Sequence, residues 1–225
     1  MNDIILYHGA KKIVSLPEYS RGTPYNDFGA GFYCTRQEDM AGQWACSRGS
    51  SGFINKYSID FDELKVLDLN SEEYTLMNWV AVILHYRKMR VSDASTARVY
   101  DYIAENFMVD FGDADIVKGN RCDDSYFTFA RAFVNGQISY EQLKYCMALG
   151  VSGEQYVLKS QKAYDLIRFI NCLPADSAVY YPRRKVRDSN ARAGFWAEID
   201  LSDGSGLYMS DILIREVKAD DQCLR

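Results

Sequence analysis

The sequence predicts an α+β fold, on three observations. Runs rich in β-branched and aromatic residues at 3–9, near the start of the chain, and at 155–160, well past its middle, are typical of short strands. Between them, residues 72–107 carry apolar side chains at helical spacing. Strands and helices do not alternate regularly, and there is no G-x-G-x-x-G or phosphate-binding loop, so a doubly wound parallel sheet is not expected.

The N-terminal elements follow from local patterns. A strand over residues 3–9 ends at Gly9, and residues 21–31 form a loop rich in glycine and turn formers. "GFYCT", residues 31–35, is a second short strand, and "FINKYSID" alternates as a strand should. Thr35 followed by Glu38 has the spacing of a capping box and predicts a helix that begins at residue 38.

The middle of the chain is predicted to be helical. Ser71 and Ser92 are the expected N-caps of two helices, and Ser139 with Gln142 forms a capping box for another. "ADIVKGN" and "QYVLKS" read as strands, residues 123–136 and 161–170 as helices, and the stretch beyond Pro174 as strands followed by a final helix. We therefore expect one domain over residues 1–173 with a helical insert at about 71–107, and a C-terminal extension, 174–225, packed on it.

Composition narrows the classes of function. The net charge of −5 argues against non-specific binding to nucleic acid. Six scattered cysteines with two histidines and no C-x-x-C pair make a metal site improbable. The acidic start is unlike a signal peptide, and no apolar run approaches the roughly 20 residues of a membrane span, so we expect a cytoplasmic protein with free thiols and no membrane partner.

Three short motifs carry a resemblance: "YHG" at 7–9, "GFYCT" at 31–35 and "EQYVLKS" at 154–160. In this order they resemble the ADP-ribosyltransferase superfamily, in its histidine–tyrosine–glutamate branch. "YNDFGAGFYCT" and the later A-x-x-W-A pattern resemble more closely a bacterial family of uncharacterised domains, the domain of unknown function 3990, placed in that superfamily. The resemblance covers roughly residues 4–170 and implies a split β-sheet core.

What the resemblance implies is an enzyme that uses NAD as a substrate, transfers ADP-ribose and releases nicotinamide. Tyr33 would stack on the nicotinamide ring, and Gly9 would hold the carboxamide through its backbone. His8 would donate to a ribose hydroxyl, and Gln155 would contact the neighbouring 2′-hydroxyl, where an oxocarbenium-like cation develops. The expected cofactor-binding set is His8, Gly9, Arg21, Gly31, Phe32 and Tyr33, with the Arg21 guanidinium on the pyrophosphate.

The chain departs from the superfamily pattern at the catalytic acid. Gln155 occupies the position of the glutamate, and an amide supplies no full negative charge. Glu154 is adjacent, but neighbouring side chains on a regular strand point to opposite faces unless a bulge at Gly153 re-aims it. Three outcomes follow: an unusual transferase, an enzyme that uses Glu154, or a binding module without turnover.

Other interpretations compete. The protein could be a weakened NAD- or ADP-ribose-binding module, an NAD glycohydrolase, or a non-enzymatic interaction domain whose tyrosines serve an interface. The acceptor would be a protein or nucleic acid selected by the helical insert. A toxin-like role with a small antitoxin-like partner is implied by resemblance only.

Several residues also have plain structural interpretations. His8 could be a hydrogen-bonded structural histidine, Tyr33 a core tyrosine and Arg21 a solvated loop arginine. Trp44 and Trp79 are predicted core residues. The stretch Arg183–Arg192 could be a phosphate or nucleic-acid patch, or a solvated loop.

Overall fold

The computed structural model describes residues 3–19, 21–88, 93–149, 153–200 and 204–225. The fold is mixed α+β, as predicted, with two sheets and eight α-helices in that part of the chain. The chain divides into two compact units, each assembled from separated segments. Unit 1 comprises Met1–Leu69, Phe111–Arg121 and Ser152–Val186, and unit 2 comprises Asn70–Asp110, Cys122–Val151 and Arg187–Arg225.

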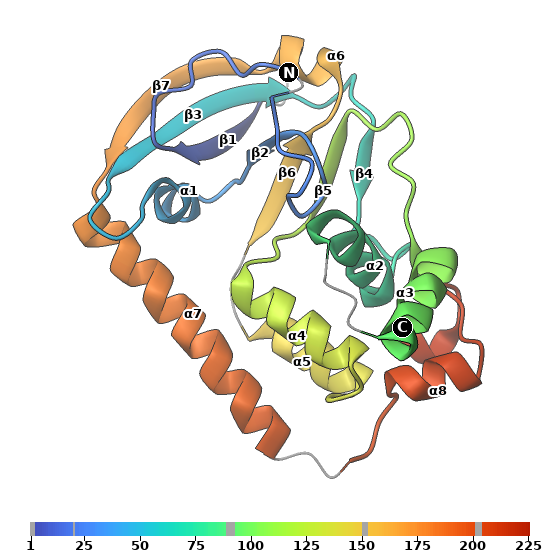
Figure 1. The fold of residues 1–225 in the computed structure, drawn as a ribbon. Coiled ribbons are helices and arrows are strands. Elements are labelled where there is room, and N and C mark those ends of the chain that lie inside the picture. The colour runs from blue at the N-terminus through green and yellow to red at the C-terminus, as the bar shows by residue number, and fades with distance from the viewer. Residues whose placement is uncertain (1–2, 20, 89–92, 150–152, 201–203) are drawn as a thin grey trace. The chain divides into compact units, whose positions relative to one another are not determined.

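Unit 1 holds both sheets (Figure 1). The first is antiparallel, in the order β1 (Asp3–Ala10), β3 (Gly52–Asp60), β7 (Arg168–Ala175). The second has the order β2 (Phe32–Cys34), β6 (Glu154–Leu158), β5 (Ile116–Asn120), β4 (Val66–Asp68), and only its β4–β5 pair is parallel. A backbone bridge joins them: the Tyr7 N–H donates to the Thr35 carbonyl at 2.7 Å, and the Thr35 N–H returns the bond at 2.9 Å.

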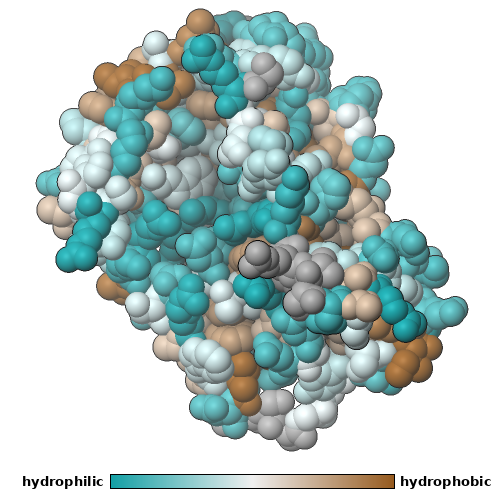
Figure 2. Space-filling view, in the orientation of Figure 1, coloured by the Kyte–Doolittle hydropathy of each residue, from teal (hydrophilic) through white to brown (hydrophobic). Residues whose placement is uncertain are grey.

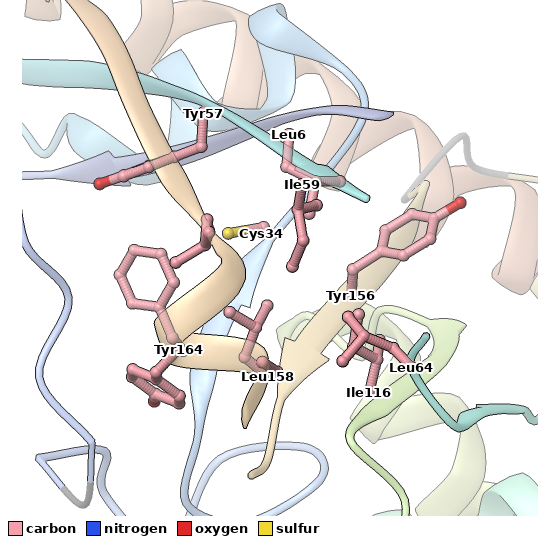
Figure 3. Packing of buried hydrophobic residues seen from close by; sticks show 12 residues of the cluster. Leu6, Cys34, Tyr57, Ile59, Leu64, Ile116, Tyr156, Leu158 and Tyr164 are labelled. Carbon is pink, nitrogen blue, oxygen red and sulfur yellow. The ribbon is translucent and has the colours of Figure 1, made fainter. Parts of the chain in front are cut away.

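The main core of unit 1 lies on one face of the second sheet (Figure 3). Strand alternation explains its membership, because Tyr156 and Leu158 of β6 point into the core, whereas Gln155 and Val157 point the other way. The buried members are Leu6, Phe32, Cys34, Tyr57, Ile59, Leu64, Ile116, Tyr156, Leu158, Ala163, Tyr164 and Ile167.

Helix α1 (Glu38–Ala45) covers the face of the first sheet that points away from this core. Its small residues Ala41 and Ala45 pack with Ile54 of β3 and Ala175 of β7. The approach is closest at Gly9, where a Cβ would lie 1.9 Å from the Ala41 carbonyl oxygen. Only glycine fits there.

Unit 2 is helical. It contains α2 (Leu76–Arg87), α3 (Ala94–Phe107), α4 (Asp124–Val134), α5 (Tyr140–Ala148), α8 (Met209–Ile214), the 3₁₀ turn Gln222–Leu224 and the C-terminal part of α7 (Ser177–Asp200). Phe195 of α7 stacks on Phe129 of α4 with ring centroids 4.4 Å apart. The predicted capping box of Ser139 and Gln142 at the start of α5 is confirmed.

Helix α1 begins at Glu38, as predicted, but the N-caps of α1, α2 (Leu76–Arg87) and α3 (Ala94–Phe107) differ from those expected. Gln37, not Thr35, is the N-cap of α1, because the Thr35 hydroxyl accepts the Gln37 N–H instead. Helix α2 begins after Thr75 rather than Ser71, through a capping box with Asn78. Helix α3 begins after Asp93, whose carboxylate accepts the Thr96 N–H, and Ser92 lies outside the described residues.

The tail also differs from the prediction. The helix expected over 161–170 stops at Leu166 (α6, Gln161–Leu166), and Arg168–Ala175 becomes β7 because it pairs with β3. The strands expected beyond Pro174 are instead one helix, α7, which includes Pro182 and the basic stretch Arg183–Arg192. A solvated loop is therefore the wrong description of that stretch.

The hydropathy of the surface and of the helices concerns two kinds of partner, other proteins and membranes. On the face drawn in Figure 2, hydrophobic residues form small groups separated by hydrophilic ones, unlike a large apolar docking patch. Within the described ranges, no helix combines the length and the apolar character needed to cross a membrane.

Candidate functional site

The predicted site residues His8 and Tyr33 meet where the two sheets join. The His8 Nδ1 lies 2.7 Å from the Tyr33 carbonyl oxygen, which can only accept, so Nδ1 carries the proton and donates. Burial lowers the pKa of His8, which keeps the ring neutral at pH 7. Nε2 is then an acceptor, opposite to the donor role expected from the resemblance.

Gly9 presents a hydrogen-bonding edge of β1. The N–H and C=O of Tyr7 both face Thr35, and alternate residues of an antiparallel strand point these groups to the same side. The N–H and C=O of Gly9 therefore face the edge just beyond the bridge, and neither has a partner among the residues that the structure describes. Position 9 must be glycine because helix α1 packs too closely for a side chain. A ligand could bind to this backbone edge of Gly9.

Tyr33 and Phe32, both predicted to bind the cofactor, do not lie on the same face of the sheet. They point to opposite faces of β2: Phe32 is only 9% exposed and packs in the core against Tyr57 and Tyr164, with the His8 ring 4.3 Å from its own. Tyr33 is partly buried on the other face. Its hydroxyl donates to the Gly29 carbonyl at 2.6 Å and accepts the Phe28 N–H at 2.9 Å. Phe32 is thus a core residue, and Tyr33 is tied to the loop at residues 27–30.

Gly31 allows β2 and β6 to approach each other. A Cβ on Gly31 would lie 2.5 Å from Val157 Cγ1 and 2.7 Å from the Leu158 carbonyl oxygen. A Cβ on Gly22 would lie 2.4 Å from the Gly31 nitrogen, so the loop that leads to β2 folds tightly back on this strand. Gly31 was predicted to bind the cofactor, and the structure gives it a role in the packing of the backbone.

Gln155 lies on the Tyr33 face of the sheet. Val157 is the register partner of Tyr33, and Gln155 is two residues along the same strand. Its side chain is 2% exposed, and its Nε2 donates to Oδ2 of Asp27, itself 9% exposed, at 3.0 Å. Tyr33 and Gln155 therefore share one face of the second sheet, whereas the His8 ring contacts Phe32 on the opposite face and reaches Tyr33 only through its backbone carbonyl.

Glu154 lies on the opposite face. The β5–β6 ladder is regular from residue 154 to 158, and no bulge interrupts it. Glu154 forms an ion pair with Lys118 at 3.0 Å and accepts a hydrogen bond from the Tyr156 hydroxyl at 3.3 Å. Lys118 also forms an ion pair with Asp68. The expected alternative in which Gly153 re-aims Glu154 does not occur, although Gly153 has a φ of +73°.

Arg21 pairs with an acidic residue of its own loop. Its guanidinium pairs with Glu18 at 2.8 Å, and the side chain is 71% exposed. Such a pair is largely solvated. The pyrophosphate clamp predicted for Arg21 stays a prediction.

Two residues that the sequence analysis missed anchor the same loop. Asp27 binds Gln155, and the Lys159 ammonium donates to the carbonyls of Phe28 at 2.7 Å and Ala30 at 2.6 Å. Burial lowers the pKa of Lys159 to about 8. The signal was available in part, because Lys159, one residue past the end of β6, follows Gln155 at even spacing and so continues the same face.

Trp44 is not the core residue that was expected. Trp79 is 3% exposed, but Trp44 on α1 is only partly buried, and the guanidinium of Arg121 lies 4.9 Å from its ring centroid. Its buried indole N–H has no hydrogen-bond partner in the part of the chain that the structure describes. Separately, a hollow of about 500 Å³ beside β1 is lined by Asp3, Ile4, Ile5, Tyr7 and Arg36, none of them a predicted site residue.

Comparison with known proteins gives one result. The family model described as "Protein of unknown function (DUF3990)" matches residues 4–169. Neither the curated proteins nor the solved structures contain a match. The match includes every element of the cluster, from His8 through Tyr33 to Gln155, and extends over well over half of the sequence. The chain therefore belongs to the DUF3990 family.

Proposed function

We propose that this protein binds NAD at the junction of its two sheets and transfers ADP-ribose from it, with release of nicotinamide. The observation that carries the proposal is the backbone edge of Gly9, one residue from His8 and beside the strand that bears Tyr33. A primary carboxamide has one acceptor oxygen and one donor nitrogen on the same carbon. The N–H and C=O of a single strand residue are complementary to that pair.

The neighbouring side chains suit the ribose. His8 Nε2 is an acceptor on a ring fixed by its bond to the Tyr33 carbonyl, so a ribose hydroxyl would donate to it. The Gln155 carbonyl oxygen is a second acceptor for the 2′-hydroxyl. Cleavage of the glycosidic bond leaves an oxocarbenium-like sugar, which such oxygens stabilise as its positive charge develops. Tyr33 would contribute its ring face to the cationic nicotinamide.

A second candidate is a binding module that holds NAD or ADP-ribose without turnover. The uncharged side chain of Gln155 favours it, because an amide stabilises a developing cation less than a carboxylate does. If water is the acceptor, the protein is an NAD glycohydrolase. Nicotinamide release detects transfer and hydrolysis alike, so one assay covers both enzymatic forms.

The experiment compares neighbouring residues on one strand. NAD binding is measured by calorimetry and nicotinamide release by chromatography, for the wild type, His8→Ala, Gln155→Ala and Glu154→Ala. We expect the first two variants to lose release and Glu154→Ala to retain it, because Glu154 faces away from Tyr33. Binding without release supports the module. Absence of NAD binding in the wild type refutes both forms, and loss of release only in Glu154→Ala refutes the assignment of Gln155.

A further inference from the structure

We propose that Asp27 is a positioning residue for Gln155: it fixes the orientation of the amide and supplies the negative charge that the amide lacks. The inference rests on the proposed function, since it describes how the acceptor oxygen of that site is set. Its basis is one buried contact, the 3.0 Å bond from Gln155 Nε2 to Asp27 Oδ2. The two residues come from distant parts of the chain, the loop before β2 and the strand β6.

The carboxylate decides which way the amide points. An ionised carboxylate only accepts hydrogen bonds, so the NH₂ group of Gln155 must face Asp27. The carbonyl oxygen is thereby turned away from Asp27 and offered as an acceptor. A glutamine without such a neighbour could present either end.

Burial makes the contact strong and its charge effective. With 2% and 9% of the two residues exposed, water screens the pair little. The bond to a charged acceptor polarises the amide and draws more negative charge onto its carbonyl oxygen. A site for a developing cation thus receives, through Gln155, part of the effect of a carboxylate.

Asp27 does not depend on Gln155 for its place. Four further bonds hold the residues that follow it, and three of them join the Tyr33 hydroxyl to Phe28 and Gly29 and the Lys159 ammonium to Phe28. Lys159 also binds Ala30. The loop therefore brings the carboxylate to Gln155 as a preformed element, which is what a positioning role requires.

The test exchanges the two functional groups. The variants are Asp27→Asn, Gln155→Glu and the double variant Asp27→Asn/Gln155→Glu, which keeps an amide–carboxylate pair but places the charge on β6. We expect Asp27→Asn to reduce nicotinamide release about tenfold, the effect of replacing a charged hydrogen-bond acceptor by a neutral one, with little change in NAD affinity. Gln155→Glu alone places two carboxylates together, so its Tm should fall as pH rises. The double variant should recover both release and Tm.

Two readouts separate this inference from the proposed function. Wild-type release in Asp27→Asn, or a double variant no better than the worse single variant in both release and Tm, overturns the positioning role. If the wild type neither binds NAD nor releases nicotinamide, the proposed function fails. The Tm cycle still reports the pair in that case: recovery in the double variant supports the contact, and additive losses refute it.

Discussion

The substitution Gly9→Ala tests how closely helix α1 is packed on the first sheet. The added Cβ would meet only backbone: the Ala41 carbonyl oxygen at 1.9 Å, the Ala45 nitrogen at 2.8 Å and the Ala41 carbonyl carbon at 2.9 Å. Ordinary contact begins at 3.4 Å. The helix would therefore have to retreat by about 1.5 Å, because no side chain can rotate away to relieve the overlap.

The expected cost is at the upper end for overpacking, about 3 kcal/mol. For a chain of this length that corresponds to a fall in Tm of about 6 to 12 °C. Thermal unfolding followed by circular dichroism measures it. If NAD binds at the Gly9 edge as proposed, the substitution should also weaken that binding, because the edge of β1 moves together with the helix.

Gly49→Ala is the matched control. Gly49 has a φ of +66° and no atom within 4 Å of the ideal Cβ, so its cost is conformational only, about 1 kcal/mol, or a fall in Tm of about 2 to 4 °C. Equal losses in the two variants would refute the packing explanation for Gly9.

Three more predictions concern the loop and the histidine. Tyr33→Phe removes both hydroxyl bonds to residues 28 and 29 and should cost about 1 to 3 kcal/mol in urea unfolding, whereas the exposed Tyr145→Phe should cost nothing measurable. With a folded pKa of about 8 and an ordinary one of 10.5, Lys159 binds fewer protons in the folded chain between these values, so wild-type stability relative to Lys159→Met should rise with pH from 8 to 10.5; a flat difference contradicts the burial of its ammonium. Burial holds the pKa of His8 below 6.5, so its contribution to stability should fall as pH drops below 6.5, and His8→Gln should remove that part of the slope in pH-dependent melting.

Four of the strands were predicted well, because the pattern that indicates each one lies within its own residues. β1, β3, β5 and β6 lie where apolar alternation and the flanking glycines put them. The capping box at Ser139 was correct for the same reason. The strand β7 was missed because its exposed residues show little alternation, and pairing with β3 decides its structure.

The candidate site was predicted in part. Its three motifs do come together, and alternation correctly placed Glu154 and Gln155 on opposite faces. Asp27 and Lys159 were missed because their roles depend on how one loop folds over β6, which no spacing rule encodes. Phe32 was misassigned although the same alternation separates it from Tyr33.

The order in which unit 1 is assembled has a consequence for the cell. Strand β6 pairs with β2 and carries Gln155, the hydrogen-bond partner of Asp27. The ribosome synthesises β6 long after β2 and Asp27. A nascent chain that has not yet released β6 from the ribosome holds His8 and Tyr33 but no site. Chains that terminate early would therefore lack the candidate site, which is complete only once β6 has emerged and paired with β2.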